Sequence, residues 1–357
     1  MNSKRVLMTL VVLALCWCIK AQSTQRSIPK TAAYGLRFKS VLVADKYIYY
    51  IEATSNNAVM GIDRKTGLIT TIIPGIDGIY EGARDKFTSI KGNDQLLYLK
   101  TWNKLYAYTP GKEKPWLDLG NHVEVVATSP DCFKVLLRER DESYVLFDFT
   151  SGQQLLNFSS NYIMPQKVFV ASNGCMWYKG GNNLGHIGLK RIDLNGQEQF
   201  YDMWNMDYIV QARRNGGVQI ADIVQKGDSL FLSCGRRIYC VNMLSDGIIE
   251  EYAKVPPTED NSFGRFGIDS KGNILADGKH AALYRVGKYD SPINLGKNPS
   301  SGLKTFDFTE IWLNLSRIVT DVDNNFVIYR TDGTKIYVYN PNGVKGFTQT
   351  RGKVTKK

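Results

Sequence analysis

The stretch that decides the fold reads Tyr144-Val145-Leu146-Phe147-Asp148-Phe149-Thr150-Ser151-Gly152. Its first five residues are apolar or aromatic up to a closing aspartate, which is typical of a buried β-strand. The remaining residues form a tight turn, in which glycine supplies the positive φ that such a turn requires. The stretch therefore predicts a strand that leads through a hairpin into another strand.

The same strand recurs along the whole chain. Equivalent apolar or aromatic segments occur at 59–63, 104–108, 189–193, 237–242, 282–286 and 335–340. Turn glycines follow six of the seven segments, at Gly67, Gly111, Gly152, Gly196, Gly247 and Gly343. A second apolar strand precedes each segment, at 47–51, 95–100, 133–138, 176–179, 229–233, 273–276 and 326–330. The pattern predicts seven repeats, each with four strands.

A single repeat of this kind cannot bury both faces of its sheet, whereas sheets packed radially cover one another and expose only short edges. We therefore predict an all-β fold, a seven-bladed β-propeller of four-stranded antiparallel blades over residues 37–347. Six or eight blades, or a pair of β-sandwiches, remain open as alternatives. The composition, 43% hydrophobic and 22% charged, excludes a disordered chain.

Two groups of motifs carry a resemblance to known propellers. The segments 63–67 and 148–152 resemble the turn of quinoprotein-type blades, and 269–275 resembles the strand entry of NHL-type and two-component-regulator-type repeats. The resemblance spans nearly the whole chain as a blade pattern and implies a propeller. Since the docking tryptophans of quinoproteins are not repeated, we expect no bound quinone or other cofactor.

The two ends differ from the repeats. Lys4 and Arg5 precede a short apolar run at 6–19, and Ala21 supplies a small residue at a cleavage point. This order is typical of a bacterial secretory signal peptide, and the run is shorter than the roughly 20 residues that span a membrane. We expect a signal peptide at 1–21, a lead-in segment at 22–36 and a basic tail at 348–357. The product is then exported, periplasmic or extracellular, without a transmembrane segment. Despite the net charge of +11, an exported chain is not expected to bind nucleic acid.

In a propeller, the hairpins between strands 2 and 3 of each blade share one face with the links from strand 4 to the next blade, and that face commonly holds ligand sites. Long links at 71–86, 201–217, 253–265 and 295–317 and the hairpins bring aromatic and basic side chains there. Such side chains suit a sugar or an anionic ligand, by stacking and by bidentate hydrogen bonds. The candidate ligand-binding residues are Trp102, Arg138, Trp204, Tyr208, Arg213, Arg236, Arg265, Trp312 and Arg330.

The sequence contains no nucleophile elbow, no phosphate-binding loop and no zinc-binding or calcium-binding motif, and we expect no metal site. The leading hypothesis is an exported binding or scaffold module for a carbohydrate ligand or a protein partner. The alternative is an enzyme that acts on acidic glycans, such as a polysaccharide lyase. Lyase chemistry requires a cation beside the uronate carboxylate and a group that moves a proton. Its candidate residues are His186, His280, Tyr208, Arg213 and Arg265.

Overall fold

The computed structural model describes residues 32–34, 38–52, 57–63, 69–74, 86–102, 104–112, 116–120, 124–159, 161, 164–165, 167–203, 220–245, 247–254, 263–268, 274–278, 282–286, 293–297, 317–320, 326–329 and 336–339. The expected signal peptide and basic tail lie outside these ranges. Within them, no helix is long and apolar enough to cross a membrane.

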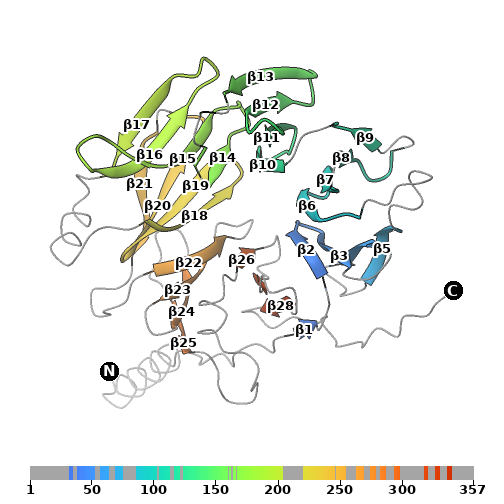
Figure 1. Ribbon diagram of the computed structural model, residues 1–357. Helices are drawn as coiled ribbons and strands as arrows, with labels where there is room; N and C mark the ends of the chain where they lie inside the picture. The colour runs from blue at the N-terminus through green and yellow to red at the C-terminus, as the bar shows by residue number, and fades with distance from the viewer. Residues whose placement is uncertain are drawn as a thin grey trace, which may run out of the picture.

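The described strands pair into seven four-stranded antiparallel sheets, which we number in chain order (Figure 1). Sheet 1 comprises β2 (Phe38–Val43), β3 (Tyr47–Glu52), β4 (Val59–Asp63) and β5 (Ile69–Ile73). Sheet 2 comprises β6 (Ser89–Gly92), β7 (Leu97–Lys100), β8 (Leu105–Tyr108) and β9 (Trp116–Asp118). Sheet 3 comprises β10 (Glu124–Thr128), β11 (Lys134–Arg138), β12 (Tyr144–Asp148) and β13 (Gln153–Phe158). Each of these sheets keeps its strands in sequence order, as the hairpin repeat predicts.

Sheets 4 to 6 follow the same rule. Sheet 4 comprises β14 (Val168–Val170), β15 (Met176–Gly181), β16 (Ile187–Ile192) and β17 (Glu198–Asp202). Sheet 5 comprises β18 (Ile220–Lys226), β19 (Ser229–Cys234), β20 (Arg237–Asn242) and β21 (Ile249–Lys254). Sheet 6 comprises β22 (Phe263–Ile268), β23 (Ile274–Gly278), β24 (Ala282–Val286) and β25 (Ile293–Lys297). The prediction of an all-β fold built from four-stranded antiparallel sheets is confirmed.

Sheet 7 joins the two ends of the described chain. It holds β26 (Arg317–Thr320), β27 (Phe326–Tyr329) and β28 (Ile336–Tyr339), and its fourth strand is β1 (Ala32–Tyr34). Ala33 pairs with Tyr337 across an antiparallel ladder. The segment 22–36, expected to be a lead-in, thus contributes a strand that the sequence analysis did not identify.

The sheets follow one another around a common centre, with their first strands on the inner side (Figure 1). Four pairs of first strands are in contact: β2 with β6, β10 with β14, β18 with β22, and β22 with β26. Side chains join two further pairs, because Lys91 of β6 donates to the Val125 carbonyl of β10 and Gln225 of β18 donates to the Val170 carbonyl of β14.

The core lies between neighbouring sheets rather than inside one central layer. The largest cluster packs Trp177 and Leu189 of sheet 4 against Leu232 and Val241 of sheet 5. Similar clusters join sheets 1 and 2, 2 and 3, 3 and 4, and 5 and 6. Each fully buried aliphatic side chain stabilises the fold by about 1.5–3 kcal/mol, so the sheet-to-sheet contacts hold the arrangement together.

A bulge recurs in the first strands and connects the sheets. The register shifts between Phe38 and Ser40 in β2 and between Ile220 and Asp222 in β18. A bulge redirects the side chain that follows it. Accordingly, the Ser40 hydroxyl accepts from the backbone N–H of Ile90 in sheet 2, and the Asp222 carboxylate accepts from that of Phe266 in sheet 6. The bulges thus give the inner strands polar side chains that reach the next sheet.

Candidate binding pocket

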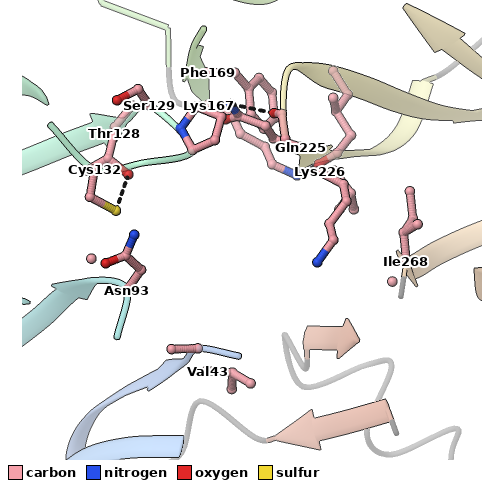
Figure 2. A pocket seen from close by; sticks show the side chains of 18 of the residues that line it. Val43, Asn93, Thr128, Ser129, Cys132, Lys167, Phe169, Gln225, Lys226 and Ile268 are labelled. Carbon is pink, nitrogen blue, oxygen red and sulfur yellow. Dashed lines mark hydrogen bonds between the residues drawn. The ribbon is translucent and has the colours of Figure 1, made fainter. Parts of the chain in front are cut away.

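A pocket of about 800 Å³ lies among the innermost strands of sheets 1 to 6 and the turns that follow them. This volume is in the range of small-molecule sites. Figure 2 shows side chains from several sheets around the space. The polar and charged side chains of the lining are Asp45, Asn93, Thr128, Ser129, Lys167, Asp222, Gln225 and Lys226. Apolar side chains, among them Val43, Phe169 and Ile268, complete the wall.

Lys167 and Asp222 form an ion pair between sheets 4 and 5. The Lys167 Nζ lies 2.8 Å from Asp222 Oδ1 and also donates to the Ile223 carbonyl. Asp222 Oδ1 accepts from the Ile223 N–H at 2.9 Å as well. The Lys167 ammonium further lies over the Phe169 ring, 5.6 Å from its centroid. The charges of this pair are therefore balanced within the protein, and the pair connects three sheets.

Asn93 is held in a fixed orientation by its own turn. Its side-chain Oδ1 accepts from the backbone N–H of Gln95 at 2.8 Å and of Leu96 at 3.0 Å. This is an Asx turn, in which the side-chain carbonyl is used by the backbone. Because the oxygen is used in this way, the Nδ2 amino group is left to face the pocket (Figure 2).

Cys132 and Thr128 lie beside Asn93 on the wall that sheet 3 provides. The Cys132 Sγ lies 3.6 Å from Thr128 Oγ1 and donates to it. Burial raises the pKa of the Cys132 thiol to about 11, although the Thr128 hydrogen bond acts in the opposite direction. The thiol therefore stays protonated at neutral pH and is no nucleophile. The Thr128 hydroxyl, acting as acceptor for the thiol, keeps its own hydrogen for a further acceptor.

Lys226 ends β18 and extends into the pocket (Figure 2). Its Nζ lies 4.0 Å from Asp45 Oδ1, with side-chain exposures of 34% and 67%. An exposed ion pair at this distance contributes little, roughly 0–1 kcal/mol. The Lys226 ammonium is thus positioned in the cavity without a close partner among the described residues.

The structure describes the side chains of four residues singled out by the sequence analysis, and all four lie on strands 2 and 3 or their hairpins. Trp102 is 82% exposed between β7 and β8. Arg138 ends β11, and its Nη2 lies 3.3 Å from Glu124 Oε2. Arg236 is half-buried between β19 and β20. His186 Nδ1 lies 2.7 Å from Asp202 Oδ2.

The other candidates cannot be placed in the same way. Trp204, Tyr208, Arg213, His280, Trp312 and Arg330 lie outside the described residues, and Arg265 is described only as part of the β22 backbone. The lyase hypothesis depends on residues of this group, so the grouping that it requires stays a prediction. Among the residues that the structure describes, no group of His, Cys, Asp and Glu is arranged to hold a metal ion.

The pocket lies away from the predicted face. In an antiparallel sheet, the turns between strands 1 and 2 lie at the opposite end from the hairpins between strands 2 and 3. Ala44, Asn93, Ser129 and Gly227 of the lining belong to 1–2 turns. These residues were not among the candidates from sequence, because aromatic and basic side chains in long loops indicated the other face. The available signal was a charged residue within or directly before an apolar first strand, as at Asp222 and Lys226 in β18 and at Lys167 before β14.

No family model and no curated protein matches the chain. Solved structures are similar to it at low identity. Two structures of the extracellular domain of BT4673 from B. thetaiotaomicron, described as part of a one-component system and of a hybrid two-component system, share 12% identity at a TM-score of 0.47. They match 87% and 85% of this chain, which spans only 39% and 38% of theirs. The computationally designed protein Ika8 shares 11% identity over 86% of this chain and 97% of its own, at a TM-score of 0.45.

Proposed function

We propose that this chain is an exported seven-bladed β-propeller that acts as a binding module and holds a small polar ligand in its central pocket. The blade count is supported by the seven sheets and by β1, which completes the sheet formed by the last three strands. Pairing of the first strand with the last one fastens such a ring, because it places both ends of the chain in one hydrogen-bonded sheet.

The observation that carries the binding role is the pocket itself. It has a volume of about 800 Å³ and contains the Lys226 ammonium with no described partner closer than 4.0 Å. An ammonium and an amide that face the same cavity can both donate to one polar ligand, and a few such convergent polar groups are typical of small-molecule sites. The site also draws on six sheets, which is typical of a rigid scaffold that presents one preformed site.

Filling the pocket tests this role. Val43 and Gln225 line it from sheets 1 and 5, so Val43→Trp and Gln225→Trp should each occupy the ligand volume. We expect some member of a panel of small sugars and sugar acids to raise the melting temperature of the wild-type protein by about 5 °C at saturation. Both tryptophan variants should lose this shift.

The control is Trp102→Ala, which removes the exposed tryptophan on the opposite face and should leave the shift unchanged. Melting of each variant without ligand, followed by circular dichroism, checks that it is folded. If the pocket variants keep the shift and Trp102→Ala abolishes it, the ligand binds at the 2–3 hairpins and the proposal is wrong.

A further inference from the structure

Most polar groups of the pocket are satisfied by the protein itself. Lys167 is bound by Asp222, and the Gln225 amide donates to the Val170 carbonyl at 2.8 Å. Ser129 bonds to Asp131. These groups stabilise the arrangement of the sheets and offer a ligand little that is new.

Three of the groups that remain are donors, and they outnumber the acceptors that remain, which are the Gln225 Oε1 and the Asp45 carboxylate. The Lys226 ammonium, the Asn93 Nδ2 amino group and the Thr128 hydroxyl hydrogen all lie in the lining, and no hydrogen bond to an acceptor is formed by any of them within the described part of the chain. The charged acceptor beside them is Asp45, whose side chain is 67% exposed at 4.0 Å from Lys226. The pocket therefore has an excess of donors.

From this excess we infer that the ligand is a small monocarboxylate that also carries hydroxyl oxygens, that is, a sugar acid. The inference rests on the proposed function of the pocket and names its ligand class. The carboxylate binds the Lys226 ammonium, while Asn93 and Thr128 donate to neutral oxygens. Val43 and Ile268 contact the carbon skeleton.

Other ligand classes fit the same groups less well. A fully apolar ligand would displace solvent from these half-buried donors without replacing its hydrogen bonds, which would cost binding free energy at each of them. A doubly charged phosphate calls for more than one available cation, but the second ammonium, that of Lys167, is already neutralised by Asp222. A cationic ligand would pair with the Asp45 carboxylate, but the Lys226 ammonium lies 4.0 Å from that carboxylate and would repel the ligand. Among the described lining residues, Lys226 carries the ammonium that has no close carboxylate, and a ligand with one negative charge matches it.

The test uses D-glucuronate and D-glucose, which differ only in a carboxylate at one carbon. Isothermal titration should show that glucuronate binds at least tenfold more tightly than glucose. Lys226→Gln should weaken glucuronate binding by about 10- to 100-fold, which is the effect of losing a hydrogen bond to a charged group, and should leave glucose binding unchanged. Lys254→Gln is the matched control, because Lys254 is exposed at the end of β21.

Asp45→Asn is expected to act in the opposite direction and to tighten glucuronate binding several-fold, because it removes the carboxylate that competes for Lys226. Equal affinity for the two sugars, binding of neither sugar, or no effect of Lys226→Gln would overturn the inference. Equal binding that Val43→Trp and Gln225→Trp still abolish would overturn the ligand class alone and leave the proposed function standing. Binding that survives both tryptophan variants would overturn the proposed function as well.

Discussion

Gly92→Ala is expected to destabilise the protein by more than about 3 kcal/mol, because the new methyl group has no space and the backbone has the wrong handedness for it. Gly92 has a φ of +116°, and a Cβ built there lies 2.0 Å from the Leu96 carbonyl oxygen. That oxygen cannot move away freely, since it accepts from the Asn93 N–H at 3.0 Å. The substitution therefore breaks the turn that orients Asn93 in the pocket.

Gly111→Ala provides the matched control. Gly111 also has a positive φ, +78°, but a Cβ there meets nothing within 4 Å. We expect a loss of only about 1 kcal/mol, from backbone conformation alone. Denaturant unfolding of the two variants, followed by tryptophan fluorescence, measures the difference. Equal destabilisation would contradict the tight turn that the structure places at the pocket wall.

The second large effect is expected at Asp94, which fastens sheet 2 to sheet 1. Its Oδ2 accepts from the Lys46 N–H at 2.7 Å, and its Oδ1 accepts from the Tyr49 hydroxyl at 2.9 Å. Tyr49 is only 2% exposed, and burial raises the pKa of its hydroxyl, so this group remains a donor at neutral pH. Asp94→Ala leaves that donor buried without its acceptor and should cost about 3 kcal/mol.

Asp45→Ala is the control, because Asp45 follows its inner strand at the equivalent position in sheet 1 and forms only a 4.0 Å ion pair. We expect it to cost under about 1 kcal/mol. A double-mutant cycle with Tyr49→Phe separates the hydroxyl from the rest, since removing both partners should restore about 1–2 kcal/mol relative to additivity. Strict additivity would show that the Tyr49–Asp94 bond does not fasten the sheets.

The clamp at Asp94 recurs, which indicates that it belongs to the repeat. Asp228, in the corresponding turn of sheet 5, accepts from the Ser172 N–H of sheet 4 at 2.6 Å. Both aspartates follow an inner strand and reach back to the 1–2 turn of the preceding sheet. These contacts fasten the turns that line the pocket to one another.

The strands were predictable from sequence where the signal is local. The segments expected at 59–63, 144–148 and 237–242 are β4, β12 and β20 with the same bounds. An alternating apolar pattern beside a glycine turn needs no distant partner to be recognised. In contrast, β1 has three residues and becomes a strand only by pairing with β28, some 300 residues away, which no local pattern reports.

The pocket was not predictable for a related reason. Lys167 and Asp222 lie 55 residues apart, and their pairing depends on how sheets 4 and 5 pack. The bulge that redirects Asp222 arises from the pairing register of β18 with β19. The residue types of a short stretch of sequence do not determine that register. Trp102 and His186 lie in or beside the expected hairpins, so the sequence placed individual residues better than it located the cavity.

A crystal structure of the protein with its tightest-binding sugar acid would test the central claim most directly. We expect density for one ligand in the central pocket, with its carboxylate at hydrogen-bonding distance from the Lys226 ammonium and a hydroxyl oxygen beside Asn93. A pocket that holds only water, with the ligand bound instead at the 2–3 hairpins beside Trp102, would contradict the claim.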